Sequence, residues 1–511
     1  MSGRYGTFNT YGGNLAVAGN PMGKTSGPYY RISGFYQNSD GYISTPESQR
    51  NQFTRKRFLQ EANGTLALGY RLNPDHIVEF AGSYYYDKRG EGTQILAPEG
   101  MYRDFDTTNL SFKYQGGVQD LKWEIQGFYQ LENYRRISES LSGTNYTRFD
   151  VNSDREEEGL LFHISKILFP HNRVTLGTDL KRGKIDGVDE YKTSPDRTRN
   201  TGAMDFYALY LQDEVDLLDG RLNLLGGLRY DYAKFYDGSY NSTLASYSSL
   251  NGNLKEHSWS ALTPKLSGRY LFLRNLSAFA SYGRGFRASI LDDLSRSGIM
   301  WGLYKVANPD LNPETVDSYE IGVDYKPLTA LKLSTSLFYS LGHDFLYYVP
   351  TGGSLSGRPL YRRENIGKVE IYGGEFDARY ALNRSVTLFA NYTYNHSEIK
   401  SFTKNPSLEG TELTNTPQHQ VRVGIDWLNR LLNAGFYYHY KSSQFAYTNE
   451  MRQIKTVISE YHTLDLKVWR EIVKNLTVSA MIQNVFDSQH LESGTDLAPG
   501  RFILGELRYR F

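Results

Sequence analysis

Apolar and polar residues alternate along most of this chain, in segments of about 10–15 residues that are separated by turns or loops. In residues 475–483, one face carries Leu476, Val478, Ala480 and Ile482, and the other carries Asn475, Thr477, Ser479 and Gln483. Residues 319–326, 420–427 and 503–511 alternate in the same way. Strict alternation predicts β-strands with one face in an apolar environment and the other in a polar one.

Alternation alone fits two architectures, a soluble β-sandwich and a wide transmembrane β-barrel. The segment lengths favour the barrel, because a strand needs about 9–11 residues to cross a bilayer, whereas soluble strands commonly have about 5–6. Aromatic residues near the segment ends also fit a barrel with interfacial girdles. Examples are Tyr84–Tyr86, Tyr347–Tyr348 and Tyr437–Tyr438.

The predicted connections alternate between short and long. Short ones include residues 73–74, 116–117, 170–172, 219–220, 327–329, 382–384 and 428–430, and long ones lie near 41–54, 88–101, 134–154, 185–202, 233–256, 288–314, 349–360 and 399–416. Outer-membrane barrels place short turns on the periplasmic side and long loops outside. A soluble sandwich has no reason to sort its connections in this way. The sequence therefore predicts an all-β fold, a transmembrane antiparallel β-barrel.

We count about 21 strands and take residues 5–18 as the first. An odd number of strands conflicts with closure of the barrel, because bacterial single-chain barrels close with an even number of strands. The alternation of the connections also places the N-terminus in an outer loop. We therefore expect residues 1–511 to form a single barrel domain that lacks its first strand, either as a fragment or as one half of a split barrel. Residues 1–20 also lack the basic and apolar regions of a signal peptide.

Composition narrows the classes of function. The 511 residues carry 57 Lys+Arg and 56 Asp+Glu, and the formal charge of +1 provides no global field that would attract nucleic acid. The mean hydropathy of −0.54 is too polar for a bundle of membrane-spanning helices. Alternation reconciles this polarity with a membrane protein, because only every second strand residue faces lipid. The absence of cysteine excludes disulfides, thiolate zinc sites, Fe–S clusters and cysteine nucleophiles.

One motif is more specific than the alternation. It reads Asn308-Pro309-Asp310-Leu311-Asn312-Pro313-Glu314-Thr315 and is followed by Ser318-Tyr319-Glu320-Ile321-Gly322. This motif resembles the signature of TonB-dependent outer-membrane receptors, and further segments resemble the same family in the expected order. They are residues 211–214, 227–231, 283–288, 416–419, 484–487 and 499–501 and the terminal Phe511.

The resemblance implies a 22-stranded barrel in the outer membrane of a Gram-negative bacterium, with a globular plug in its lumen. Such a barrel binds a scarce extracellular ligand, such as a siderophore, cobalamin or another metal chelate, at its outer loops and passes it through the lumen. The TonB complex supplies the energy by displacing the plug. This sequence has no counterpart of the plug or its TonB box. The expected partners are therefore outer-membrane lipid and the small-molecule ligand, with TonB a partner only if a plug is supplied.

Two other hypotheses belong to different classes. In one, a plug-less barrel acts as a passive, porin-like pore, or as the scaffold of a split receptor that a plug-bearing partner chain completes. In the other, the chain is a soluble β-rich binding or carbohydrate-active protein, and the sorting of the connections by length argues against it.

The sequence shows no sign of an enzyme. The ten histidines fall singly and no serine nucleophile elbow occurs, so we expect no catalytic residue, no metal site and no cofactor. Haem receptors of the resembled family carry a histidine within the stretch that corresponds to residues 289–307. This stretch contains none here, which argues against haem as the ligand.

The signature residues are expected to have a structural role at the base of an extracellular loop. They are Asn308, Pro309, Leu311, Pro313, Glu314, Tyr319, Glu320 and Gly322, while Phe511 resembles the terminal aromatic by which the family's barrels are handed to the assembly machinery. Taken alone, the motif could equally be a loop stop and a strand start. We interpret the acidic groups Asp292-Asp293 and Glu156–Glu158 as solvated charges.

Candidate ligand-binding residues lie in the longest loop, just below it and at a strand tip. They are Arg287, Trp301, Tyr304, Tyr347 and Tyr348. Aromatic rings stack on planar ligands, and an arginine pairs with carboxylate or catecholate oxygens. The competing interpretation for each of them is membership of an ordinary interfacial girdle.

Overall fold

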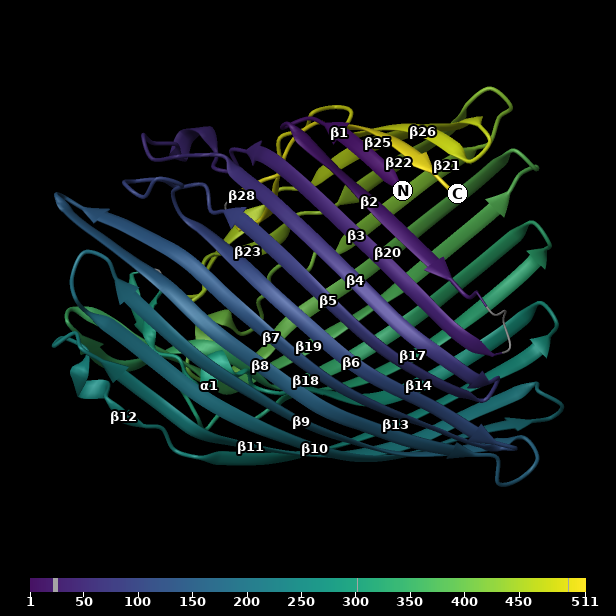
Figure 1. Ribbon diagram of the computed structural model, residues 1–511, viewed down its shortest axis with the longest axis horizontal. Coiled ribbons are helices and arrows are strands. Elements are labelled where there is room, and N and C mark those ends of the chain that lie inside the picture. The colour runs from purple at the N-terminus through teal and green to yellow at the C-terminus, as the bar shows by residue number, and fades with distance from the viewer. Residues whose placement is uncertain (22–25, 301, 495) are drawn as a thin grey trace.

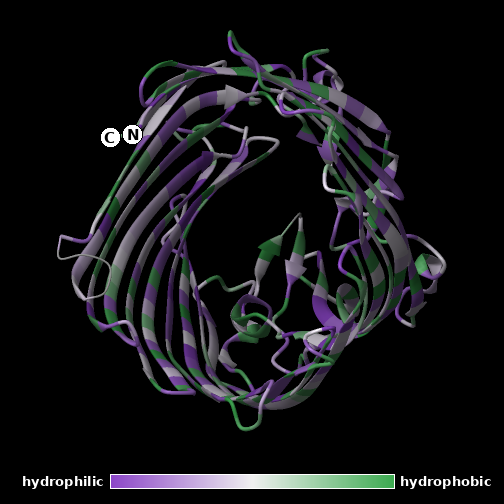
Figure 2. Cartoon of the chain, turned by 90° about the vertical axis from the view of Figure 1, so that its right-hand side faces the viewer, coloured by the Kyte–Doolittle hydropathy of each residue, from purple (hydrophilic) through white to green (hydrophobic). Residues whose placement is uncertain are grey.

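The computed structural model describes residues 1–21, 26–300, 302–494 and 496–511. Long oblique strands surround a central lumen (Figures 1 and 2). Among the described residues, 22 antiparallel strands form the closed wall. The prediction of an all-β antiparallel barrel is therefore confirmed.

The wall strands follow one another in chain order, and each pairs with the next. In the first half they are β1 (Ser2–Gly6), β2 (Thr10–Gly19), β3 (Gly27–Tyr42), β4 (Arg57–Asn73), β5 (His76–Gly90), β6 (Tyr102–Val118), β7 (Leu121–Ser142), β8 (Asn145–Lys166), β9 (Asn172–Tyr191), β10 (Arg197–Leu217) and β11 (Leu222–Ser242). In the second half they are β13 (His257–Leu273), β14 (Leu276–Arg287), β17 (Glu314–Leu328), β18 (Leu331–Leu355), β19 (Arg358–Ala381), β20 (Val386–Phe402), β21 (His419–Trp427), β22 (Asn433–Lys441), β25 (Tyr461–Val473), β26 (Leu476–Gln483) and β29 (Phe502–Tyr509).

Short elements occupy the long connections between wall strands. They are α1 (Leu291–Ser295), the 3-10 turns η1 (Glu47–Gln49), η2 (Ser248–Leu250) and η3 (Pro406–Leu408), and the strands β12 (Gly252–Asn253), β15 (Gly298–Met300), β16 (Leu303–Lys305), β23 (Gln444–Asn449), β24 (Ile454–Ile458), β27 (Leu491–Ser493) and β28 (Asp496–Leu497). In the described part of the chain, no helix has the length and apolar character needed to cross a membrane.

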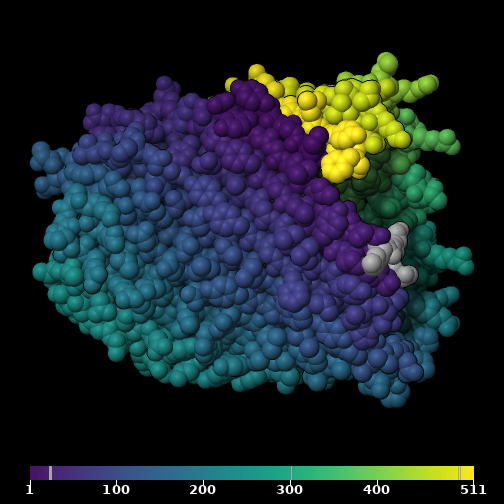
Figure 3. Space-filling view, in the orientation of Figure 1, coloured from purple at the N-terminus to yellow at the C-terminus, as the bar shows by residue number. Residues whose placement is uncertain are grey.

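The wall closes between its first and last strands. All five residues of β1 pair with β29, and β1 pairs with β2 along its other edge. The amino group of Met1 donates a hydrogen bond to the carbonyl oxygen of Tyr509 at 2.8 Å. The two ends of the chain consequently lie side by side on the outer surface (Figure 3).

The expected count of 21 strands is one too low, and the expected placement of the N-terminus in an outer loop is wrong. Residues 5–18 contain two strands rather than one, joined by a turn at residues 7–9. Gly6 faces Thr10 across this turn, so the alternation continues through it without a change of phase. With this additional strand, the described wall closes with an even number of strands.

Hydrophobic and hydrophilic residues alternate along the wall strands (Figure 2), so that side chains of the two kinds point to opposite faces. Large apolar side chains point outward and stay exposed in the isolated chain; Ile321, in the middle of β17, is 58% exposed. Its neighbour Glu320 faces the lumen, where it lines a pocket with Ser281 and Glu375. An outer band of exposed apolar residues requires a lipid environment.

Most connections are sorted by length between the two ends of the barrel, as predicted. Short turns, such as residues 74–75, lie at one end, the short-turn end, and longer connections lie at the other, the long-loop end (Figure 1). Three connections expected to be long loops are largely continuations of strands instead; in one of them, β9 and β10 stay paired up to Glu190 and Arg197. β7 and β8 stay paired up to Ser142 and Asn145, and β18 and β19 up to Leu355 and Arg358. Continued backbone hydrogen bonding extends these hairpins because it satisfies each N–H and C=O group.

Candidate functional site

The connection between β14 and β17, residues 288–313, folds into the lumen at the long-loop end. We call it the inner loop. Its helix α1 packs against β9, β10 and β11. The hairpin β15–β16 follows, and β16 pairs in parallel with β19, with Tyr304 opposite Leu360 and Lys305 opposite Tyr361. The inner loop is therefore attached to two separate parts of the wall.

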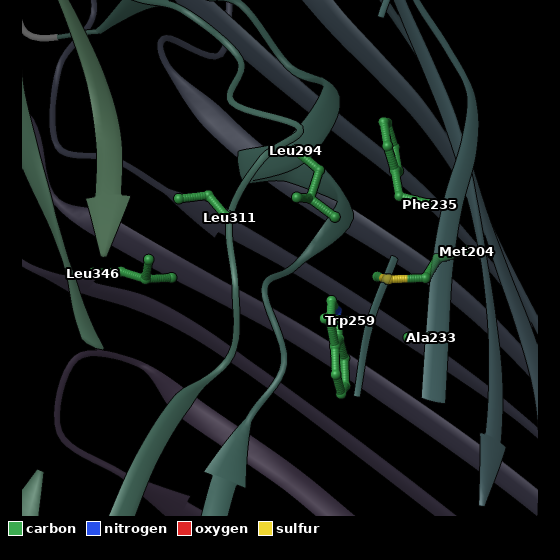
Figure 4. Close-up of a cluster of buried hydrophobic side chains, with 7 residues drawn as sticks. All are labelled: Met204, Ala233, Phe235, Trp259, Leu294, Leu311 and Leu346. Carbon is green, nitrogen blue, oxygen red and sulfur yellow. The ribbon is translucent and has the colours of Figure 1, made fainter. Parts of the chain in front are cut away.

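Apolar packing fixes the first of these attachments. Leu294 of α1 and Leu311 of the signature motif are each 1% exposed and contact side chains from the wall. The cluster comprises Met204, Ala233, Phe235, Trp259, Leu294, Leu311 and Leu346 (Figure 4). Complete burial of a leucine contributes about 1.5–3 kcal/mol, so this contact favours the inward position of the loop.

A buried group of charges fixes the second attachment. The Lys305 side chain is 3% exposed, and its ammonium lies 2.9 Å from a carboxylate oxygen of Asp292 and 2.9 Å from one of Asp293. It also donates to the Asp292 carbonyl oxygen at 3.0 Å. Arg296 lies 3.6 Å from Asp292, and Arg363 of β19 lies 3.3 Å from Asp293. We call these five residues the ionic cluster.

The ionic cluster also contacts the connection between β22 and β25, which contains β23 and β24. Arg363 pairs with Glu450 of that connection at 3.0 Å and lies over the ring of Tyr348 at 4.5 Å from its centroid. The side chain of Gln453 donates to the Tyr348 carbonyl oxygen. The inner loop, the β18–β19 hairpin and the connection between β22 and β25, which are far apart in the sequence, are thus interlocked across the long-loop end of the lumen.

The charges of the cluster shift the pKa values of Asp292 and Lys305. Burial by itself would raise the pKa of Asp292, but the nearby Lys305 ammonium and Arg296 guanidinium lower this pKa to about 2. Burial would likewise lower the pKa of Lys305, and the two aspartates together raise it above its ordinary value. Asp292 and Lys305 are therefore both charged at neutral pH.

Acid should release the inner loop. The pKa of Asp292 is about 2 in the folded loop and about 3.9 in an unfolded chain, so its stabilising effect is complete above pH 4 and disappears as the pH falls towards 2. The full loss at low pH is about 2.6 kcal/mol, of which about 1 kcal/mol is reached at pH 3. Hydrogen exchange of the α1 amides at pH 6 and pH 3, corrected for intrinsic rates, measures it. Strand β10 serves as the internal reference, and equal protection of α1 at both pH values would contradict the assignment.

The structure distributes the candidate ligand-binding residues over different environments. Tyr304 is 1% exposed, and its hydroxyl group is hydrogen-bonded to that of Tyr240 at 2.6 Å. Tyr347 packs on Phe402, and Tyr348 is covered by the ionic cluster. Trp301 lies outside the described residues. In this conformation the three tyrosines are packing residues, and their role in ligand binding stays a prediction.

Arg287 differs from these tyrosines because its side chain is 66% exposed. It is the last residue of β14, and its guanidinium forms an ion pair with the buried carboxylate of Glu314. The second oxygen of Glu314 accepts a hydrogen bond from the backbone N–H of Leu346 at 2.6 Å. This arrangement holds the guanidinium at the base of the inner loop and leaves part of it open to an anionic group.

The signature motif forms the base of the inner loop. Asn308 donates to the Arg363 carbonyl oxygen at 2.7 Å, and its own carbonyl oxygen accepts from the N–H of Asp310. Asn365 exchanges two hydrogen bonds of 2.8 Å with the backbone of Asn312. Pro309 and Pro313 lie in this same turn between β16 and β17. These contacts support a structural role for the motif.

The rest of the signature lies on β17. Tyr319 points outward and packs on Tyr282, whereas Glu320 points into the lumen. At Gly322 a Cβ atom would lie 2.4 Å from the ring of Phe279 on the neighbouring strand, so only glycine allows that ring to lie across β17. The terminal Phe511 is exposed beyond the end of β29.

The lumen wall is polar and carries ion pairs within and between its strands. Arg229 contacts Asp179 at 2.7 Å and Asp231 at 2.8 Å, and Arg155 contacts Glu132 at 2.8 Å. Among the described residues, no group of three or more carboxylate or imidazole side chains is arranged to hold a metal ion.

The sequence interpretation missed the ionic cluster. It treated Asp292 and Asp293 as solvated charges, which is wrong for Asp293, whose side chain is 7% exposed and paired with Lys305. The Glu156–Glu158 group does lie exposed on β8, as interpreted. The pairing of Arg363 with Asp293 carries no sequence signal, because the two residues lie about 70 positions apart in the chain.

A closed antiparallel wall with an apolar outer face, a polar lumen and loops interlocked across one mouth defines a large β-barrel of the outer-membrane transport type. The family model for the TonB-dependent receptor-like β-barrel matches residues 2–485. The chain therefore belongs to this family, which comprises transport proteins rather than enzymes. Its long-loop end corresponds to the extracellular side and its short-turn end to the periplasmic side.

Individual relatives agree with this assignment. The chain is 23% identical over 440 residues to the iron-regulated outer membrane virulence protein of Vibrio cholerae serotype O1 (strain O395), an alignment that covers 83% of this chain and 61% of the relative. It is 22% identical to the ferrienterobactin receptor of Escherichia coli (strain K12), with 84% and 59% covered. The chain thus spans about three fifths of the length of these relatives.

Solved structures show the same fold. The chain resembles the copper transporter OprC with a TM-score of 0.79 and 16% identity, and the alignment covers 100% of this chain and 79% of that one. It resembles the ferric yersiniabactin uptake receptor FyuA from Yersinia pestis with a TM-score of 0.77 and 16% identity, over 100% and 79% of the two chains.

Proposed function

We propose that this chain is the barrel of an outer-membrane receptor that takes up a scarce metal chelate of the siderophore or cobalamin type. The family membership supports a transport role, and relatives named for ferrienterobactin and ferric yersiniabactin support a metal chelate as the ligand. In this proposal the chelate binds at the extracellular mouth and moves through the polar lumen. Movement depends on the TonB complex where a plug domain with a TonB box occupies the lumen.

The observation that carries the proposal is the interlocked extracellular mouth. The inner loop and the connection containing β23 and β24 meet over the lumen through Arg363. A constitutively open pore has no need of such an obstruction, whereas a receptor needs a structured surface that a ligand can recognise. The mouth therefore favours a receptor over a passive channel.

Arg287 is the proposed ligand-binding residue. Its exposed guanidinium is oriented by Glu314, and a guanidinium binds carboxylate or catecholate oxygens with two parallel hydrogen bonds. Ligand contact at this position would also reach the base of the inner loop, because Glu314 is bonded to the backbone at Leu346.

Binding of a ferric catecholate chelate to the detergent-solubilised chain tests the proposal, with tryptophan fluorescence as the readout. We expect Arg287→Gln to weaken binding about tenfold, since it removes a charge-assisted hydrogen bond. The matched control Lys255→Gln removes an exposed extracellular cation that pairs with Asp310, and it should leave binding unchanged.

Planar-bilayer conductance separates the receptor from the passive pore. A low, gated conductance that falls further when the chelate is added supports the receptor. A large, constant conductance that the chelate does not change, together with the absence of binding, supports a passive pore and contradicts the proposal.

A further inference from the structure

A pocket of about 600 Å³ lies on the lumen wall near the periplasmic end, away from the extracellular mouth. Strands β13, β17, β18, β19, β20 and β21 contribute to it. Its lining carries five cationic side chains, Arg269, Lys326, Lys332, Arg379 and Arg422, and three carboxylates, Asp324, Asp377 and Asp426. The pocket therefore has a surplus of positive charge in its immediate lining.

Two of the cations face each other directly. Lys332 of β18 and Arg379 of β19 are register partners on the lumenal face of the wall. Like charges that lie directly opposite one another on paired strands destabilise a sheet. Within the described part of the chain, neither side chain has a carboxylate at ion-pair distance. The folded wall thus brings these two charges together without compensating them.

The three carboxylates of the pocket already have partners. Asp324 accepts from Arg269 at 2.8 Å and from Ser334 at 2.7 Å. Asp426 accepts from Tyr437 at 2.7 Å, and Asp377 accepts from the side-chain amide of Asn391. These bonds direct the carboxylates along the wall. The surplus positive charge of Lys332 and Arg379 remains available to the lumen.

Arg422 adds a third cation in a fixed position. Its guanidinium lies over the rings of Phe389 and Tyr437, at 5.7 Å and 6.0 Å from their centroids. Gly424 allows this stack, because a Cβ atom there would lie 2.1 Å from the Phe389 ring. No described carboxylate pairs with Arg422. Aromatic stacking positions the guanidinium while its N–H groups stay free to donate.

We propose that this pocket binds a multivalent oxyanion, a small solute bearing carboxylate or phosphate groups, between Lys332, Arg379 and Arg422. Such an anion would relieve the repulsion between the two register partners and accept hydrogen bonds from both guanidinium groups. Multivalency fits the site because three cations from three strands surround one space. The inference is independent of ligand recognition at the extracellular mouth, since no residue is shared between the two sites.

Citrate and inorganic phosphate are the probes, added to the intact chain in detergent at an ionic strength of about 10 mM, where charges are little screened. Isothermal titration should show saturable binding of citrate that is tighter than that of phosphate and weakens when the salt concentration rises. Lys332→Gln/Arg379→Gln should weaken citrate binding about tenfold or more. The control Lys467→Gln, at a lumenal cation on β25 that lies against Trp469, should leave it unchanged.

Thermal unfolding gives a second readout that does not depend on titration heats. Without anion, the double variant should unfold at a higher temperature than the wild type, because the like-charge contact is gone. Citrate should raise the unfolding temperature of the wild type but not that of the variant. Equal citrate effects on both proteins, or a double variant that is less stable than the wild type without anion, would overturn the proposal. Failure of chelate binding at Arg287 would leave these results unaffected.

Discussion

Lys305→Met should loosen the inner loop, because it removes the ammonium group that joins β16 to α1 within the loop. The substitution retains most of the aliphatic stem but leaves the carboxylates of Asp292 and Asp293 without their shared ammonium group. Removing one partner from a buried ion pair costs about 3–5 kcal/mol because the remaining charge stays buried. We expect amide exchange in α1 and β16 to become at least about 100-fold faster, as measured by hydrogen–deuterium exchange. Exchange in the wall strands should not change.

Two variants delimit this interpretation. Lys255→Met breaks the exposed pair with Asp310 and should change loop exchange by less than about 1 kcal/mol. Adding Asp292→Asn and Asp293→Asn to Lys305→Met removes the uncompensated charges and should restore part of the protection. If Lys305→Met leaves exchange in α1 unchanged, apolar packing of Leu294 and Leu311 holds the loop by itself.

Ile321→Arg should destabilise the barrel in a bilayer. Ile321 lies at the middle of β17 and points outward, and an arginine on the lipid face near the bilayer midplane costs about 2–4 kcal/mol. The measurement is the free energy of unfolding from denaturant titration of the chain refolded into lipid vesicles. The same substitution should have little effect in a short-chain detergent, where the guanidinium reaches water.

The matched control for Ile321→Arg lies at the same depth on the opposite face. Ser281 of β14 is the register partner of Glu320, and both line the lumenal pocket. Ser281→Arg therefore places the new charge in water beside a carboxylate and should change stability by less than about 1 kcal/mol. Equal losses in the two variants would contradict the assignment of the outer and lumenal faces.

The strand count shows where sequence interpretation reached its limit. Tyr5 and Tyr11 point to the same side of the wall because the turn between them leaves the alternation in phase. Hydrophobic periodicity therefore could not reveal the turn. The local sign was weak: Phe8 and Asn9 adopt positive φ angles of 58° and 50°, a conformation that asparagine tolerates better than phenylalanine does. Closure through β1 became visible only when its pairing with β29 was known.

The candidate ligand residues show a related limit. The side-chain chemistry of Arg287 and Tyr304 suits a planar anion, yet Arg287 is exposed at the base of the inner loop and Tyr304 is buried against Tyr240. Side-chain chemistry depends on the residue type alone. Exposure depends on which distant segment covers the residue, and the sequence pattern carries no signal for that.

The sequence by itself determined the class of this protein, the two faces of its strands and the sorting of its connections. Each of these follows from local chemistry, because the period-two alternation and the turn residues act between neighbours along the chain. Tertiary structure alone decided the closure of the wall and the inward folding of residues 288–313. It also decided which charges meet, such as Lys305 with Asp293 and Arg363 with Glu450. These features depend on burial and charge compensation between segments that meet only when the barrel is formed.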